Sequence, residues 1–237
     1  MRVGKFTSSS IGDLMSKGRG NWTLENTGKP FDTLVKKKYW EARLGRTIDK
    51  QVNSKPLNWG NLVESYAFEH LPMDLDLHSS KRFVHDEISV WSGAPDYTNE
   101  KIVGDIKCPY TLQGFIELYE IIENKDLEAF KKEKSSYYWQ LVSNSILTGL
   151  DIAEITVFIP KKSQLEEIRE KARESIEEDQ NKYAFVNWAE DNELPYLPDD
   201  CEIDNVSSFS FEVPEEDKIA LYSRVLLAKN MVEEMLK

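Results

Sequence analysis

Two neighbouring stretches of the sequence decide its fold: Gly93-Ala94-Pro95-Asp96-Tyr97 and Ile102-Val103-Gly104-Asp105-Ile106-Lys107-Cys108-Pro109. A polar turn, Thr98-Asn99-Glu100, separates them, so they predict a two-stranded hairpin with Asp96 on its first strand. Residues two apart in a strand face the same side, which places Asp105 and Lys107 together on one face. Pairing of the two strands would then bring the carboxylates of Asp96 and Asp105 close to each other.

Two carboxylates on paired strands favour a divalent metal ion. Mg²⁺ prefers oxygen ligands in octahedral geometry and usually takes only one or two protein carboxylates, with carbonyl groups and water filling the other positions. Asp96, Asp105 and the main-chain carbonyl of Ile106 meet that requirement, and Mn²⁺ accepts the same oxygen ligands. Lys107 would add a compact cation beside a water molecule and a phosphate. The pattern therefore indicates hydrolysis of a phosphodiester by a metal-activated water.

The same motif also has an ordinary structural explanation. Asp96 could be a turn residue after Pro95, and Asp105 with Lys107 a surface ion pair on an exposed strand. The context favours the metal site, because Gly-x-Pro-Asp, a turn, an apolar-flanked Asp-x-Lys and a Cys-Pro strand end occur in sequence. Glu64 adds a third carboxylate, on a helix predicted over residues 58–71. For Glu64 alone, a residue that simply suits the helix dipole is an equally good explanation.

A helix predicted from Tyr137 to Leu147 carries Gln140. Gln140 lies on a polar face with Tyr137, Ser143 and Asn144, while the apolar residues of this helix pack inward. A polar face is usually just solvated, but here it could line the cleft of the predicted site.

The remaining pattern predicts helices around a mixed central β-sheet, that is, an α/β fold. We predict one domain over residues 1–237, with the core motifs in 2–160 and an acidic helical and loop elaboration in 161–237. The other predicted helices cover residues 7–16, 31–44, 111–123, 162–182 and 215–236, and the strands cover 82–92, 101–108, 154–159 and 209–213.

The net charge of −12 argues at first against a nucleic-acid partner, but the charge is unevenly distributed. Residues 1–59 hold 12 Lys and Arg against 5 Asp and Glu, whereas residues 60–160 hold 8 against 17. The local field steers a polyanion, so a basic N-terminal third could hold DNA beside an acidic metal site. On charge alone, a solvated helix face around Lys36, Lys37 and Lys38 is the simpler explanation.

Cysteine content and hydropathy exclude several classes of protein. The only cysteines, Cys108 and Cys201, cannot provide a disulfide framework or a four-cysteine metal site within one chain. Cys108 is interpreted as a small buried residue rather than a nucleophile. No run of about 18 apolar residues occurs, so no membrane span is expected. A reducing cytoplasm is the simplest location.

Four ordered blocks resemble the PD-(D/E)XK nucleases, and within them the phage lambda exonuclease-like (viral recombinase exonuclease) family. Four motifs in order over residues 2–150 are far more specific than one. The second acidic position is Asp105, where many members carry glutamate. The blocks are Arg2-Val3-Gly4-Lys5-Phe6-Thr7-Ser8-Ser9, Trp59-Gly60-Asn61-Leu62-Val63-Glu64, Pro95-Asp96 with Asp105-Ile106-Lys107-Cys108-Pro109, and Tyr137-Tyr138-Trp139-Gln140.

This resemblance implies a restriction-endonuclease-like core and a role for each matching residue. Asp96, Asp105 and the Ile106 carbonyl would hold one Mg²⁺, and Glu64 would complete the site or hold a second ion. Lys107 would orient or help to deprotonate the attacking water, and Gln140 would position Lys107 or the substrate. Arg2 and Ser9 would receive the 5′-phosphate of a DNA end.

The activity implied by the resemblance is a metal-dependent exonuclease that degrades one strand of linear double-stranded DNA from the 5′ end, in recombination or repair. The resemblance also implies a ring-shaped homotrimer and a single-strand annealing partner protein. The setting would be the cytoplasm of a bacterial or phage-infected cell.

Two other functions remain open on the sequence. A structure-specific endonuclease or resolvase of the same fold would cut closed circular duplex, whereas an exonuclease needs an end. A DNA-end-binding protein with a silent site would keep its affinity in EDTA and release no nucleotides. The complete Asp, Asp and Lys set argues against a silent site, since such a site would be free to lose a member.

Overall fold

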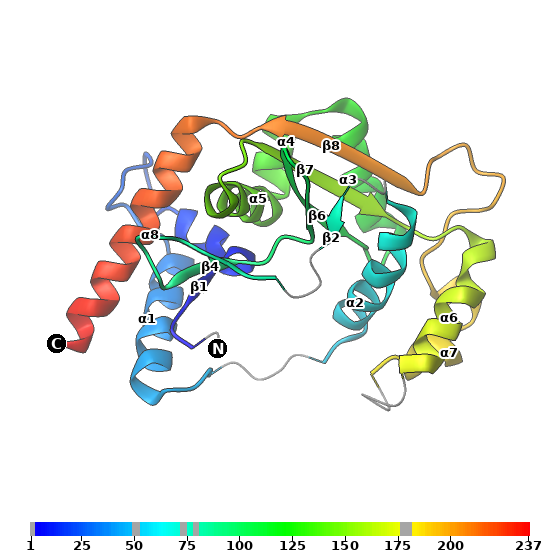
Figure 1. Cartoon of the computed structure of the whole chain (residues 1–237), viewed down its shortest axis with the longest axis horizontal. Helices are drawn as coiled ribbons and strands as arrows, with labels where there is room; N and C mark the ends of the chain where they lie inside the picture. Colours follow the sequence, from blue (N-terminus) through cyan, green and yellow to red (C-terminus); the bar gives the residue numbers. More distant parts are fainter. Residues whose placement is uncertain (1–2, 49–52, 72–74, 78–80, 176–181) are drawn as a thin grey trace.

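A five-stranded mixed sheet forms the centre of the computed structural model, which describes residues 3–48, 53–71, 75–77, 81–175 and 182–237 (Figure 1). The strand order is β2-β5-β6-β7-β8. Strands β6 and β7 run parallel, and the other neighbouring pairs are antiparallel. The strands are β2 (Asp76–Leu77), β5 (Tyr97–Thr98), β6 (Ile102–Lys107), β7 (Ile152–Phe158) and β8 (Val206–Glu212).

The prediction of a single strand over residues 82–92, paired with residues 101–108 in a hairpin, is wrong. This segment is split into β3 (Phe83–Val84) and β4 (Trp91–Gly93), which pair with each other, and β1 (Phe6–Thr7) adds parallel to β4. The split has a local cause, because the ring of His85 accepts the backbone amides of the two residues Glu87 and Ile88 and turns the chain. Among the described residues, the hairpin consists of β5 and β6 alone, so it is short, and the chain crosses between two sheets just before it.

Helices cover both sides of the central sheet, and most of them match the sequence prediction. They are α1 (Lys29–Leu44), α2 (Lys55–Ala67), α3 (Leu112–Asn124), α4 (Leu127–Glu133), α5 (Ser135–Thr148), α6 (Leu165–Glu174), α7 (Ala184–Trp188) and α8 (Glu215–Leu236), with 3-10 turns η1 (Ser8–Met15), η2 (Phe68–His70), η3 (Lys162–Gln164) and η5 (Asp191–Glu193).

Three helix predictions need correction. The first, over residues 7–16, is a 3-10 helix whose N-cap, Thr7, shares its hydroxyl with neighbouring serine hydroxyls instead of capping an amide. Helix α2 begins at Lys55 rather than residue 58, because Ser54 caps it and a proline occupies its first turn. In the described part of the chain, the helix predicted over 162–182 ends at Glu174, and residues 176–181 lie outside the described residues.

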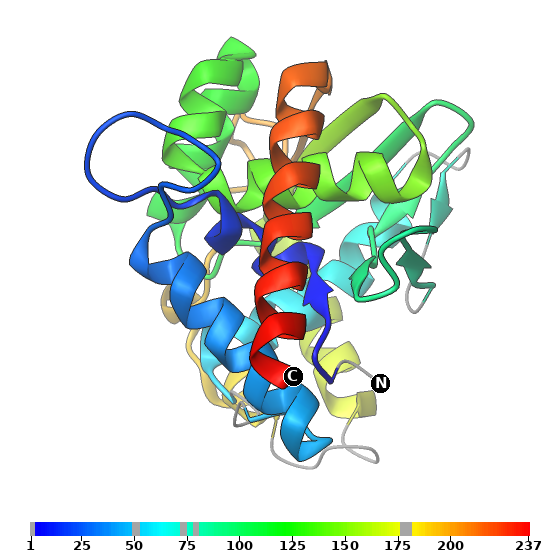
Figure 2. The same cartoon turned by 90° about the vertical axis from the view of Figure 1, so that its left-hand side faces the viewer.

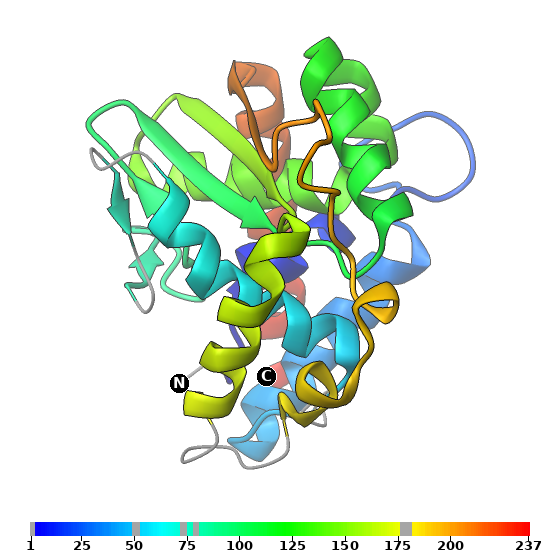
Figure 3. The same ribbon diagram turned by 90° about the vertical axis from the view of Figure 1, so that its right-hand side faces the viewer.

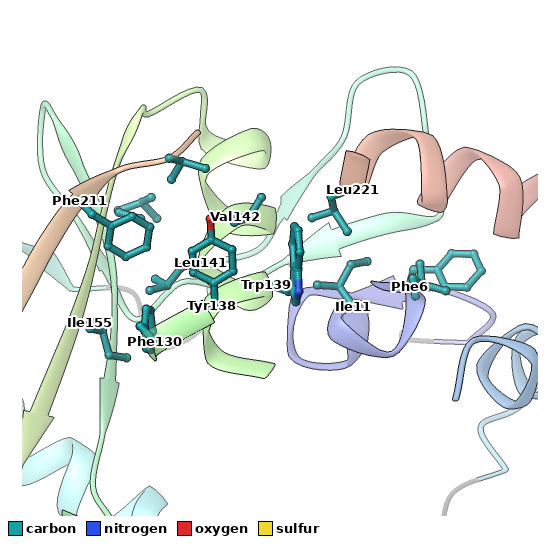
Figure 4. Packing of buried hydrophobic residues seen from close by; sticks show 14 of the residues in the cluster. Phe6, Ile11, Phe130, Tyr138, Trp139, Leu141, Val142, Ile155, Phe211 and Leu221 are labelled. Carbon is teal, nitrogen blue, oxygen red and sulfur yellow. The ribbon is translucent and has the colours of Figure 1, made fainter. Parts of the chain in front are cut away.

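Apolar side chains pack in two clusters on opposite faces of the sheet. One cluster joins α5, α8, α1 and η1 to residues such as Val103 and Ile155, and Figure 4 shows α5 side chains between strand residues and η1. The other cluster joins α2 and α6 to Ile106 and Phe158. Figure 2 shows α1 and α8 side by side, and Figure 3 shows α2, α6 and α7 together. Both faces of β6 are therefore covered.

This double coverage settles the environment of the Asp-x-Lys motif. As predicted, the side chains of β6 alternate, with Val103 in one apolar cluster and Ile106 in the other. The alternative of an exposed strand is wrong, because Asp105 is fully buried on the face that α5 covers. In the described part of the chain, no helix is both long enough and apolar enough to cross a membrane.

A buried polar contact fixes α5 against the C-terminal helix. Asp217, in the first turn of α8, accepts hydrogen bonds from Tyr138 on α5 at 2.6 Å and from Lys131 on α4 at 2.6 and 2.7 Å. The side chains of Asp217 and Tyr138 are almost completely shielded, while Lys131 is about one-third exposed. Removing the carboxylate would strand a buried hydroxyl and an ammonium group.

Replacement of Asp217 by alanine is therefore expected to lower the free energy of unfolding by about 2–3 kcal/mol. The measurement is urea unfolding at neutral pH. Asp151→Ala is the matched control, because Asp151 pairs with Lys218 at the surface and its side chain is 73% exposed. That variant should lose less than about 1 kcal/mol. Equal losses in the two variants would contradict the importance of the buried contact.

Candidate active site

Asp105 is the most deeply buried acid of the site. It lies in the middle strand of the five, with no exposed surface. Its Oδ2 accepts a hydrogen bond from the side-chain amide of Asn144 on α5, at 3.2 Å. Its Oδ1 is buried and has no hydrogen-bond partner among the described residues. A buried carboxylate oxygen without a partner is costly unless a cation or a proton satisfies it.

Asp96 lies at a bend immediately before β5, not on the strand as predicted. Pro95 precedes it and cannot donate to a strand ladder, so regular pairing starts only at Tyr97. The Asp96 amide nevertheless donates to the Gly104 carbonyl at 3.0 Å, and its Oδ2 accepts the Ile106 amide at 2.7 Å. These two bonds hold the Asp96 carboxyl group over β6, where it interacts directly with that of Asp105.

Lys107, at the end of β6, connects the acids to α5. Its Nζ lies 3.5 Å from Oε1 of Gln140 and 5.0 Å from the centroid of the Tyr137 ring. Glu64 reaches the same place from α2, on the other side of the strand end. A cleft of about 250 Å³ lies here and is lined by Pro56, Leu57, Gly60, Asn61, Glu64, Ile106, Lys107, Cys108, Pro109 and Tyr137.

The structure thus brings together five predicted residues from four segments of the chain. Glu64, Asp96, Asp105 and Lys107 lie close enough to influence one another's charge, and Gln140 touches the lysine. Ile106 lines the cleft and binds Asp96 through its amide. The roles given to these residues, including that of the Ile106 carbonyl, stay predictions.

Crowding of charge in a shielded place shifts every pKa in the site. Burial, with the negative charges of Asp96 and Asp105, raises the pKa of Glu64 to about 8. Burial raises the pKa of Asp105 to about 7, against the opposing effect of Lys107. Burial alone would lower the pKa of Lys107, but the surrounding carboxylates outweigh it and raise that pKa. The site therefore holds more acid than its one lysine can balance.

The donor set fits a divalent metal ion of the Mg²⁺ type. The site offers mainly oxygen atoms, which Mg²⁺ prefers as ligands. One of these atoms, Oδ1 of Asp105, has no hydrogen-bond partner among the described residues. Among the described residues, no three His, Cys, Asp or Glu side chains converge into a complete metal-binding group. Mg²⁺ does not require such a group, because it usually keeps several waters and takes one or two protein carboxylates.

The predicted 5′-phosphate residues lie in the N-terminal segment. Ser9 is exposed in the first turn of η1, and its hydroxyl lies 3.2 Å from that of Thr7. Arg2 falls outside the described residues. No described contact joins Ser9 to the carboxylates. The neighbouring Ser8, however, is buried against α5 through a 2.8 Å hydrogen bond with Ser143.

Asn144 is the residue of this site that the sequence prediction did not single out. The polar face of its helix was expected to be solvated or to line a cleft, but Ser143 and Asn144 are completely buried. A polar pair three and four positions beyond Gln140, the last residue of the fourth motif, was the available signal. Their significance depends on where α5 packs, which the sequence does not specify.

The protein has the arrangement of the restriction-endonuclease-like fold. Helices flank a mixed sheet, helix α2 carries the acid Glu64, and the acids Asp96 and Asp105 lie with Lys107 in the β5–β6 hairpin region.

No protein-family model matches the chain. No curated protein matches it in sequence. Solved structures are more informative.

An alkaline exonuclease from Laribacter hongkongensis, LHK-Exo, is similar over nearly the whole length. Its structure in complex with dAMP has a TM-score of 0.62 at 14% identity, covering 99% of this chain and 90% of that chain. A second LHK-Exo structure has a TM-score of 0.59 at 14% identity and covers 99% and 92%. A phage-related exonuclease from Haemophilus somnus has a TM-score of 0.61 at 14% identity and covers 98% and 95%.

These matches confirm the resemblance inferred from the sequence at the level of the fold. The chain has the fold of the phage lambda exonuclease-like PD-(D/E)XK nucleases. At 14% identity the likeness establishes fold alone, so activity has to be argued from the site.

The raised acid pKa values predict a specific dependence of stability on pH in EDTA. The folded state binds protons that the unfolded chain releases, so the associated stability is complete below the ordinary carboxyl pKa. That stability is lost as the pH rises through about 7 for Asp105 and about 8 for Glu64. One such proton contributes at most about 1.4 kcal/mol per pH unit.

Glu64→Gln should therefore flatten the decline in unfolding free energy between pH of about 5 and about 8.5, measured by urea unfolding in EDTA. Glu120→Gln, at an exposed glutamate of α3, is the matched control and should keep the wild-type slope. A Glu64→Gln slope equal to that of the wild type would show that this glutamate is not held in its protonated form.

Proposed function

We propose that this protein is a Mg²⁺-dependent DNA exonuclease that acts on linear double-stranded DNA from the 5′ end. The observation that supports this most is the meeting of four side chains beside one cleft: Glu64 from α2, Asp96 from the bend before β5, and Asp105 and Lys107 from β6. An excess of shielded carboxylate with one lysine is suited to a divalent cation and a phosphodiester. The fold shared with two exonucleases favours this chemistry over others.

In this proposal Asp96, Asp105 and the Ile106 carbonyl hold the metal ion, and Glu64 completes the site or serves a second ion. A bound Mg²⁺ supplies an acidified water and neutralises charge on the phosphate; Mn²⁺ is an alternative. Lys107, raised in pKa by its acidic neighbours, stays protonated and orients the water and the phosphate. Gln140 restrains the Lys107 ammonium group from α5, at 3.5 Å.

Substrate preference is the part of the proposal that rests on the N-terminal segment. Arg2 and Ser9 would receive the 5′-phosphate, and the side chain of Ser9, in the first turn of η1, is exposed to solvent. Backbone amides at the start of a helix also favour a phosphate group. A homotrimer, a single-strand annealing partner and a single nuclease domain over the whole chain belong to the same proposal, and the family resemblance supports them.

The direct test uses the purified protein with linear 5′-phosphorylated duplex DNA, with closed circular duplex alongside. Mononucleotides should be released from the linear DNA alone, with Mg²⁺ and not with EDTA. Lys107→Ala should reduce the rate by about 100-fold or more. Lys101→Ala, an exposed lysine just before the same strand, is the matched control and should stay near the wild-type rate.

Other outcomes point to the two rival functions. Cleavage of the closed circle would indicate a structure-specific endonuclease or resolvase. Tight binding of DNA ends without cleavage, unchanged by EDTA, would indicate an end-binding protein.

Recognition of the terminal phosphate makes a separate prediction. Ser9→Ala should lower the rate on 5′-phosphorylated DNA by about 10-fold, the effect of one hydrogen bond to a charged group, and should leave 5′-hydroxyl DNA unaffected. Ser10→Ala is the control, because its hydroxyl contacts Thr7 within the segment at about 3.1 Å. The assignment fails if 5′-hydroxyl DNA is degraded as fast as 5′-phosphorylated DNA, or if Arg2→Ala has no effect.

A further inference from the structure

The side-chain amide of Asn144 is buried between β4 and β6, the strand that carries Asp105. Asn144 has no exposed surface, and its Nδ2 donates to Asp105 Oδ2 at 3.2 Å. Its Oδ1 points the other way, toward Gly93 at the end of β4. A Cβ atom built on Gly93 would lie only 2.5 Å from that oxygen. Asn144 therefore spans the space between β4 and β6.

The space around this amide is closed. The same Cβ on Gly93 would lie 2.2 Å from the hydroxyl of Ser8 and 2.8 Å from Cδ1 of Leu147. The backbone of Gly93 is not in the left-handed region, so conformation does not explain the glycine. The glycine makes room for the Asn144 amide, whose Oδ1 is buried and has no hydrogen-bond partner among the described residues.

The helix that carries Asn144 is anchored at the preceding residue. Ser143 accepts a hydrogen bond from the Trp91 indole Nε1 at 2.8 Å and shares another, also 2.8 Å, with Ser8. These contacts tie α5 to β4 and to η1. None of them involves Asp105, so the anchor of the helix and the contact with the acid are separate features.

The contact with the acid is one-sided. Asp105 has two carboxylate oxygens in a fully buried place, and the Asn144 amide takes only Oδ2. Among the described residues, Oδ1 has no hydrogen-bond partner, although Lys107 and Asp96 lie nearby. A donor on one oxygen fixes the rotation of the carboxylate and so fixes where the other oxygen points.

We propose that Asn144 is a positioning residue, which holds the Asp105 carboxylate by Oδ2 so that Oδ1 is presented to a divalent metal ion. This inference rests on the proposed function, because it assumes that Asp105 is a metal ligand. Partners that orient a ligand typically change metal affinity by 10- to 100-fold when they are removed. Asn144 would accordingly contribute to metal binding without touching metal, DNA or the attacking water.

The test measures Mn²⁺ binding to the purified full-length protein without DNA, from the electron paramagnetic resonance signal of free Mn²⁺. Asn144→Ala should raise the Kd about 10- to 100-fold. Asn144→Leu keeps the number and branching of the side-chain heavy atoms while removing the donor, and it should show the same loss. Asp105→Asn defines the binding that depends on this acid.

Ser143→Ala is the matched control, because Ser143 is equally buried on the same helix and does not touch Asp105. It should lower the melting temperature, since the buried Trp91 indole loses its acceptor and the buried Ser8 hydroxyl loses its partner, yet leave the Mn²⁺ Kd unchanged. Melting temperature and circular dichroism of each variant separate loss of folding from loss of binding.

The outcomes distinguish this inference from the proposed function. If the wild type shows no Mn²⁺ binding that Asp105→Asn removes, the metal site itself is absent and the proposed function fails. If that binding exists and both Asn144 variants retain the wild-type Kd, the positioning role is overturned while the nuclease proposal stands. If Ser143→Ala weakens binding as much as Asn144→Ala, general loosening of α5 is the explanation and the positioning role is again overturned.

Discussion

The burial of Asp105 is the constraint on which the arrangement of the site depends. A carboxylate in the middle strand of a sheet covered on both faces has lost its water, and one side-chain amide replaces only part of it. The nearby acids Glu64 and Asp96 add repulsion, and Lys107 supplies a single positive charge. Such a cluster is tolerable when protons or a divalent cation supply the missing charge. The excess of buried carboxylates over positive charge destabilises the folded protein, and the same excess favours binding of a divalent metal ion.

The fold holds this cluster through two features that lie outside the four sequence motifs. The chain passes from one sheet to the other at Pro95. Asp96 is therefore held against β6 by two hydrogen bonds, from its amide to the Gly104 carbonyl and from the Ile106 amide to its carboxylate, and not by strand pairing alone. The C-terminal segment then fixes α5. Strand β8 completes the sheet, and Asp217 of α8 binds Tyr138, two residues before Gln140. Residues 161–237 therefore contribute to the position of the helix that carries Gln140 and Asn144.

Local patterns predicted much of this correctly. The apolar and polar alternation in β6, the helices ending at Gly45 and Gly149, and the edge strand β8 follow from periodicity and from glycines with positive φ. The hairpin prediction was correct for pairing but too long, because His85 turns the chain by accepting two amides, a contact that periodicity does not encode. The prediction of a solvated helix face around Lys36, Lys37 and Lys38 was wrong for Lys38, because its side chain is buried in an ion pair with Glu41.

The sequence by itself determined the identity of the chemical groups and their order along the chain: an acid on a helix, Asp96, Asp105 and Lys107 in a hairpin context, and Gln140 on a later helix. Those features depend on residue type and short-range spacing, which a sequence displays directly. Only the tertiary structure decided that Asp105 is completely buried, that one of its oxygens has no hydrogen-bond partner among the described residues, and that Asn144 donates to the other oxygen. These facts depend on which surfaces of α5, β4 and β6 meet, and long-range packing sets that contact through the summed apolar and polar fit of segments far apart in the chain.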